Sequence, residues 1–372
     1  MNLSIPRFAS IAGLSASLIA CATAQGPPVD VPMEPVPVPA GQTPGTGPNW
    51  PITTRQHVDA WLHAFAMIQD DTTLVPYFRR GYKADMNALK RRANVTTQLD
   101  ANTANLRTRF ATNLQLVNAQ FIAQYFETFD ELQSAMDLFQ RAEGNPRSAS
   151  SREAAEIIAL LAGYFPLPAD RDWARLFTQS VRDENNRFYR AYWDQQQRER
   201  GPVVARVSDM WQNTYRSRFQ NFLSNTGQRG GEIILSMPLN GEGRTLTAGT
   251  RENSVAVTYP LREADAIEAI YVITHELVGS LTQTAVRDNV TPNDQRMGLA
   301  DQYVSIGAVR AGAMFLQKVA PELVDGYSRY YLRSANRTVG PNVSTSLATA
   351  FPLPDQIRNA ISRQIDVVLG GI

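Results

Sequence analysis

Cysteine and histidine are nearly absent from this chain, which has one cysteine and three histidines among 372 residues. A single cysteine excludes an internal disulfide framework, so the stability of the fold must come from packing. Lysine and arginine total 36 against 35 for aspartate and glutamate, a formal net charge of +1. Because such a chain has no broad basic field, we expect no nucleic-acid partner.

Long apolar runs are also missing. The apolar stretch Ile11–Ala20, which follows a short start carrying Arg7, has the length of a signal-peptide core and not of a membrane span. Residues 1–24 are therefore predicted to be a signal peptide, and the protein is expected to be exported. No later segment reaches the roughly 18 to 20 consecutive apolar residues of a membrane helix, so we expect the rest of the chain to be soluble.

Two cleavage sites are compatible with this signal. Leu18-Ile19-Ala20-Cys21 resembles the lipobox of bacterial lipoproteins, in which the cysteine becomes lipid-modified. Cys21 would then anchor an outer-membrane lipoprotein, because Ala22 and not aspartate follows it. Ala22-Thr23-Ala24 is an ordinary small-x-small site, which would leave Gln25 first in a periplasmic or secreted protein.

Residues 25–51 are rich in proline and glycine and nearly uncharged, which predicts an extended tether without a core of its own. Such a tether suits a lipid-anchored domain and a free secreted protein equally. The body of the chain divides into a helical region, residues 52–230, and a second region of different texture, residues 231–372.

In the helical region, two capping pairs predict helix starts: Thr53 with Gln56, and Ser150 with Glu153. Aromatic and aliphatic residues follow at helical spacing. Their period predicts buried helix faces and not a ligand platform. The aromatic members of these stripes include Trp61, Phe65, Trp173, Phe177, Phe188, Tyr192, Trp211, Tyr215, Phe219 and Phe222.

The second region begins with three short β-prone segments and continues with a long helix. The β-prone segments are Glu232–Met237, Arg244–Ala248 and Ser254–Tyr259. Pro260 and Arg262–Ala264 then open a helix that is expected to run to about Arg287. The predicted fold class is therefore mainly α with a small β-sheet, that is, α+β.

The long helix is apolar on nearly every face but contains His275 and Glu276. Burying such a pair costs free energy unless both members have partners. One interpretation is structural, with both side chains hydrogen-bonded to neighbouring groups. The other is catalytic, because a helix with the pattern H-E-x-x-H binds zinc through two histidines while the glutamate activates the metal-bound water. A small sheet directly before the helix is compatible with the catalytic interpretation.

Residues 231–318 resemble the gluzincin branch of the zincin metallopeptidases in this motif and in a second motif downstream. In that family the third metal ligand is a glutamate on a later helix, commonly within the pattern E-G-x-A-x-Y. This sequence has Met297-Gly298-Leu299-Ala300-Asp301-Gln302-Tyr303 at that distance. The resemblance implies a zincin-like fold, with His275 as one zinc ligand and Glu276 as the general base if the protein is active.

Two departures from the family pattern bear on mechanism. Gly279 stands where the second metal histidine belongs, and Met297 stands where the ligand glutamate belongs. One imidazole cannot hold a catalytic zinc, which typically takes three protein ligands and a water. Asp301, one helical turn beyond Met297, could supply a further ligand, but the site would still be one ligand short. The other histidines, His57 and His63, are six residues apart, a spacing that does not place them on one helix face.

Three functions remain open. The first is an exported cell-envelope binding module with a degenerate metallopeptidase-like fold and no cofactor, which holds a peptide, a glycan or another envelope protein beside the long helix. The second is an active zinc-dependent peptidase with atypical ligands, His275 and Asp301 among them. The third is a helical envelope lipoprotein unrelated to peptidases. We favour the first, because two of the three expected metal ligands are missing.

Overall fold

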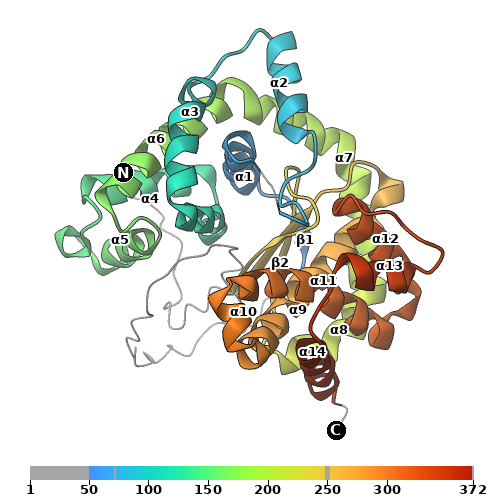
Figure 1. Ribbon diagram of the computed structural model, residues 1–372. Coiled ribbons are helices and arrows are strands. Elements are labelled where there is room, and N and C mark those ends of the chain that lie inside the picture. The colour runs from blue at the N-terminus through green and yellow to red at the C-terminus, as the bar shows by residue number, and fades with distance from the viewer. Residues whose placement is uncertain (1–49, 71–72, 248–251, 371–372) are drawn as a thin grey trace, which may run out of the picture.

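A computed structural model of the protein describes residues 50–370 except 71–72 and 248–251. The predicted signal peptide, Cys21 and nearly all of the predicted tether lie outside the described residues. Helices make up most of the described chain, and they surround one small sheet (Figure 1). The predicted class, mainly α with a small β-sheet, is confirmed. Within the described residues, no helix combines the length and the apolar surface needed to cross a bilayer.

The sheet has four strands in the order β1-β2-β4-β3. Strands β1, β2 and β4 run parallel to one another, and β3 is an edge strand that pairs antiparallel with β4. The three predicted strands are confirmed to within a residue at each end. Their bounds are β1 Ile52–Thr53, β2 Gly231–Ser236, β3 Arg244–Thr247 and β4 Asn253–Thr258.

Strand β1 was not expected, because Thr53 was predicted to cap the first helix. The backbone of Thr53 instead pairs with Ile234 of β2, and the Thr53 hydroxyl donates to the carboxylate of Glu232. The first helix begins at Gln56, after Arg55. The predicted cap at Ser150 is also wrong, by one residue: Ser151 accepts the hydrogen bond from the Ala154 N–H, at 3.1 Å.

In the sequence, the segment between β1 and β2 is mainly helical. Two π-helical turns, η3 and η4, join α6, α7 and α8 into one long helical stretch. The bounds are α1 Gln56–Ile68, α2 Tyr82–Arg92, α3 Gln98–Thr112, η1 Leu114–Tyr125, α4 Phe129–Arg141, η2 Pro146–Ser148, α5 Arg152–Tyr164, α6 Pro168–Glu184, η3 Asn185–Tyr189, α7 Arg190–Met210, η4 Trp211–Tyr215 and α8 Arg216–Asn225.

The predicted aromatic stripes lie in the core. Trp61 of α1 meets Phe177 of α6 edge to face, with ring centroids 4.8 Å apart, and Phe177 stacks on Trp173 at 4.7 Å. Such pairs add a little to the large apolar area that each ring buries. The same hydrophobic core continues from α1 through the sheet to α14, so the two predicted regions share it.

Helices also follow the sheet. The predicted long helix is α9, preceded by a short 3₁₀ turn, and every residue from Ala269 to Gly279 is buried. Helix α11 packs closely on it: a Cβ at Gly307 would lie 2.4 Å from Thr282 Cγ2, so glycine permits this approach. The bounds are η5 Glu263–Asp265, α9 Ile267–Asn289, α10 Pro292–Arg296, α11 Leu299–Val319, η6 Pro321–Leu323, α12 Val324–Ser334, α13 Val343–Ala350 and α14 Asp355–Val368.

Candidate functional site

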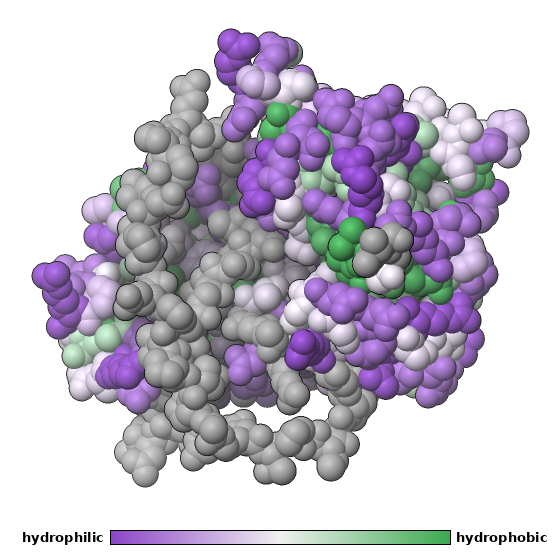
Figure 2. Space-filling model, turned by 90° about the horizontal axis from the view of Figure 1, so that it is seen from below, coloured by the Kyte–Doolittle hydropathy of each residue, from purple (hydrophilic) through white to green (hydrophobic). Residues whose placement is uncertain are grey.

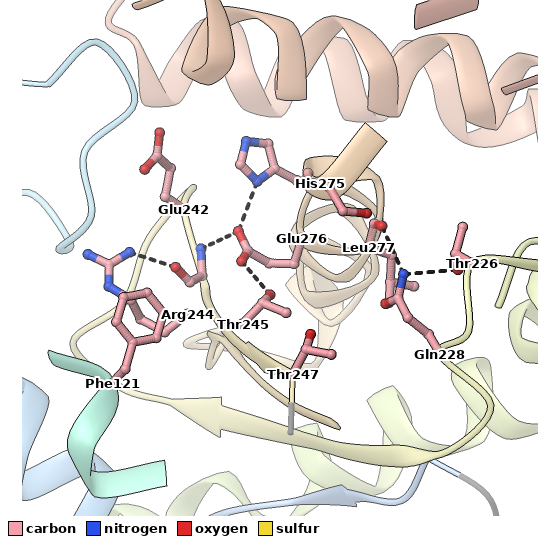
Figure 3. A pocket seen from close by; sticks show the side chains of 13 residues that line it. Phe121, Thr226, Gln228, Glu242, Arg244, Thr245, Thr247, His275, Glu276 and Leu277 are labelled. Carbon is pink, nitrogen blue, oxygen red and sulfur yellow. Dashed lines mark hydrogen bonds and ion pairs between the residues drawn. The ribbon is translucent and has the colours of Figure 1, made fainter. Parts of the chain in front are cut away.

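A small cavity lies between the edge strand β3 and helix α9, with about 160 Å³ of space (Figure 3). Helix α9 supplies one wall, which includes His275, Glu276 and Gly279. Strand β3 and the turn before it supply the opposite wall. Phe121 of η1 and Gln228, which follows α8, line the remaining sides. The motif that the sequence singled out therefore faces a cavity and not a sealed core.

Glu276 is held by three donors within this cavity. Its Oε1 accepts the Gly243 N–H at 2.8 Å and faces His275 Nδ1 at 2.9 Å, and its Oε2 accepts the Thr245 hydroxyl at 2.7 Å. Burial raises the pKa of Glu276, but the interactions with His275, Thr245 and Gly243 outweigh it and lower the pKa below its ordinary value. The side chain is thus an ionised carboxylate, and both of its oxygens are committed to protein donors.

His275 has one committed and one uncommitted ring nitrogen. Because the ionised Glu276 can only accept, Nδ1 of His275 must carry the proton of this hydrogen bond. Its Nε2 is buried without a partner among the described residues. The ring is fixed by stacking on Tyr331 at 5.3 Å, and the Tyr331 hydroxyl donates to the Gly241 carbonyl at 2.9 Å.

Glu242 is a cavity residue that the sequence did not indicate. It is 4 % exposed, and its carboxylate accepts the Ser305 hydroxyl of α11 at 2.9 Å. Burial raises the pKa of Glu242, although the charges of His275 and Arg244 oppose the rise. Figure 3 shows it approaching from the turn before β3, beside the His275 ring. Only its glycine neighbours, typical of a tight turn, marked this segment in the sequence.

Arg244 is the second cavity residue that the sequence did not indicate. Its Nε donates to Gln120 at 2.6 Å and its Nη1 to the Gly243 carbonyl at 2.6 Å, while the guanidinium lies 4.0 Å from the centre of the Tyr77 ring. Its Nη2 is buried without a partner, and within the described residues no carboxylate lies at ion-pair distance. The cavity wall therefore carries a buried cation that is solvated by amide, carbonyl and aromatic groups.

The candidate metal ligands, His275 and Asp301, and the two degenerate ligand positions, Gly279 and Met297, do not all line this cavity. Gly279 lines the cavity with His275, but Met297 is 65 % exposed at the end of α10, and neither Met297 nor Asp301 of α11 is a lining residue. Over the described ranges, no three side chains of histidine, cysteine, aspartate or glutamate could together hold a metal ion. The residues present therefore do not fit zinc, which takes three protein ligands.

The other two histidines lie in the core of the helical region. Both belong to α1: His57 Nε2 lies 2.7 Å from the Phe126 carbonyl oxygen, and His63 contacts Tyr82 and Glu184. Burial lowers the pKa of His57 to about 4. Neither histidine lines the cavity beside α9, so neither adds a donor to His275.

No family model, curated protein or solved structure matches this chain. The resemblance to the gluzincins therefore stays a prediction from the motif residues.

Proposed function

We propose that this protein is an exported cell-envelope binding module with a degenerate metallopeptidase-like fold, which holds an extended peptide along β3 without cleaving it. The observation that carries the proposal is the position of the cavity. It follows the outer edge of an edge strand, and the carboxylate at its wall is already engaged. Backbone amides are therefore the groups most open to a ligand.

The edge of β3 has the right chemistry for pairing with a peptide. On one side β3 pairs with β4, and on the other no described strand pairs with it. The Gly243 N–H points away from β4, toward Glu276. Because N–H directions alternate along a strand, Thr245 and Thr247 present their amides to the same outer edge, and both line the cavity. Outward amides such as those of Thr245 and Thr247 are a template for an added strand.

The side chains around this edge support binding and not catalysis. A metal-dependent hydrolase requires several metal ligands and a base with a free lone pair. Here Gly279 occupies the wall beside His275, and Gly243, Thr245 and His275 already take three of the roughly four acceptor sites of the Glu276 carboxylate. The Gly243 contact is close: a Cβ there would lie 2.6 Å from Glu276 Cγ. A glutamate locked in this way fixes the start of β3 in place.

Export and anchoring are part of the same proposal, although the residues concerned lie outside the described ones. A signal peptide followed by a tether would place the binding module in the envelope, with Cys21 as lipid anchor or Gln25 as free amino terminus. Mass spectrometry of the mature amino terminus decides between these two forms. A chain that retains Met1 in the cell would contradict export.

Peptide binding is tested by comparing two substitutions at one position. Thr247→Pro removes an outward N–H from the edge strand, whereas Thr247→Val keeps the N–H and the shape of the side chain. With fluorescein-labelled peptides selected from a random decapeptide array, we expect Thr247→Pro to weaken binding by about tenfold or more, which corresponds to about one lost hydrogen bond. Thr247→Val should bind within about twofold of the wild type.

Three results would contradict the proposal. The first is the absence of binding by the wild type to any peptide of the array. The second is equal binding by the proline and valine variants, which would show that the edge is not used. The third is zinc-dependent cleavage of a bound peptide together with about one zinc per chain, which would establish the active peptidase instead.

A further inference from the structure

Strand β3 separates two faces of the sheet, and a different element covers each face. The Thr245 hydroxyl donates to Glu276 of α9 at 2.7 Å, whereas Arg244, the preceding residue, donates to Gln120 of η1 at 2.6 Å. Because successive side chains of a strand point to opposite faces, Thr247 lies on the α9 side with Thr245. A peptide added at the outer edge of β3 would alternate in the same way, so every second side chain would face α9 and the others would face η1.

The cavity beside α9 reaches both of these faces around the open edge of β3. Gly279 and Ser280 of α9 line it from one face, and Phe121 of η1 lines it from the other (Figure 3). The sheet lies between α9 and η1, and Thr247 of the edge strand lines the same cavity. One cavity can touch both faces only where the sheet ends. It therefore occupies the position that an added strand would take.

Helix α9 leaves a recess in this cavity at Gly279. Gly279 and Ser280 follow Glu276 by three and four residues, so all three share one helix face, and all three line the cavity. Glu276 fills part of the α9 wall, whereas the buried Gly279 presents only backbone. Glycine is among the poorest helix formers, so helix stability does not explain its place within α9. The α9 wall thus has space for a side chain that the helix itself does not supply.

The size of the cavity limits what can enter this recess. The cavity has about 160 Å³ of space, comparable to the engineered protein cavity of about 150 Å³ that admits benzene. One aromatic ring or one branched aliphatic group matches this space. A whole small-molecule ligand of ordinary size, which needs a pocket of roughly 300 Å³ or more, does not.

The charged groups of the lining are already engaged by protein partners. Glu276 accepts from three donors, and Glu242 accepts the Ser305 hydroxyl at 2.9 Å. Arg244 donates to a side-chain amide and to a backbone carbonyl, each at 2.6 Å. A charged peptide side chain would lose its solvation here without gaining an uncommitted partner of opposite charge. The recess therefore favours an uncharged side chain.

We infer that the peptide site selects its ligand by one uncharged side chain, aromatic or branched aliphatic, which lies over Gly279 in the recess of α9. The inference rests on the proposed peptide function and adds the class of peptide that the site accepts. The residues immediately before and after this side chain would face η1 and would not enter the recess. The preference is therefore confined to one position and absent from the two adjacent ones.

A substitution scan of a bound peptide tests the inference on the wild-type protein. Each position of the tightest-binding decapeptide from the random array is replaced in turn by phenylalanine, leucine, alanine, aspartate and lysine. At one position we expect phenylalanine or leucine to bind about tenfold or more tighter than alanine, aspartate and lysine, with no such preference at either adjacent position. A scan without such a position would overturn the inference and leave peptide binding intact. A wild type that binds no peptide would overturn the proposed function and this inference with it.

Filling the recess from the protein side gives a second measurement. Gly279→Leu places a side chain in the recess, and the matched control is Gln283→Leu, one turn further on the same helix face and outside the cavity lining. We expect Gly279→Leu to bind the preferred peptide about tenfold or more weaker and the alanine-substituted peptide within about threefold of it, whereas Gln283→Leu keeps the wild-type preference. Thermal melts establish that both variants fold. Equal behaviour of the two leucine variants would overturn the inference, and if Gly279→Leu does not fold, the peptide scan decides.

Discussion

The described part of the chain contains two buried histidine–glutamate pairs, one in each region. In the helical region His63 lies 3.0 Å from Glu184, and beside the sheet His275 lies 2.9 Å from Glu276. All four residues are at most 8 % exposed. The pairs differ in what surrounds them, and this difference separates a structural network from a candidate site.

The pair in the helical region is closed. His63 Nδ1 lies 3.0 Å from the Tyr82 hydroxyl, its Nε2 faces Glu184, and Glu184 also binds Lys90 Nζ at 2.8 Å. Burial raises the pKa of Glu184, but the interactions with His63 and Lys90 outweigh it and lower the pKa to about 2. Each ring nitrogen has a partner, so the network has no place for a ligand.

The pair beside the sheet is open. Its carboxylate is satisfied, as in the first pair, but His275 Nε2 has no partner and the pair lines a cavity. A buried histidine–glutamate pair therefore does not by itself indicate catalysis. The cavity locates the candidate site, and the hydrogen bonds of Glu276 show that its carboxylate already has a structural role.

The largest expected effect comes from removing the lysine that contacts Glu184 in the closed pair. Lys90→Met leaves the charge of Glu184 buried with less compensation, because it removes the ammonium group 2.8 Å from that carboxylate. The same change removes the contact of Lys90 with Asp100 at 2.7 Å. We expect a loss of about 3 to 5 kcal/mol in the free energy of unfolding, measured by urea titration. The control Lys83→Met, at a partly exposed lysine 3.7 Å from Asp70, should cost less than about 1 kcal/mol. Equal losses in both variants would show that the network is not structural.

A second prediction concerns Asp59 of α1, the helix that links the two regions. Asp59 accepts from the Ser236 hydroxyl at 2.5 Å, the Met237 N–H at 3.1 Å and Trp193 Nε1 at 2.9 Å. Burial raises its pKa from 3.8 to about 7, although these hydrogen bonds oppose the rise.

The native state therefore binds the Asp59 proton more tightly than the unfolded chain does. The stability from this group is fully present below about pH 4 and is lost as the pH rises to about 7. Between pH 5 and pH 7 the loss is roughly 2 to 3 kcal/mol. Asp59→Asn should remove this slope, which is measured as the difference between wild-type and variant unfolding curves over that range. Parallel curves would contradict the prediction.

The smallest effect is expected at the open pair. Glu276→Gln keeps one acceptor oxygen for Gly243 or Thr245 but places an N–H₂ group against another donor. We expect the fold to persist with a loss of about 2 kcal/mol in the free energy of unfolding, because one hydrogen bond fails and the burial of a charge is relieved. Thermal melts measure it. Outright unfolding would show that this pair is as structural as the pair at Glu184.

The sequence alone determined the features that depend on local pattern. Apolar periodicity located the buried faces of α1, α6 and α9, and β-prone segments located β2, β3 and β4 to within a residue. The polar pair His275 and Glu276, inside an otherwise apolar helix, indicated the segment of α9 that lines the cavity. Each of these signals is contained within one turn, one strand or one helix, so neighbouring residues suffice to reveal it.

Which distant groups meet depends on the tertiary structure. Strand β1 has two residues and exists because β2, far along the chain, pairs with it, so no local pattern could indicate it. Glu242 joins the cavity because its turn folds back over α9, whereas Met297 ends a short helix and faces solvent. These outcomes depend on contacts between elements, and such contacts are decided by packing and by the partners available to each buried polar atom.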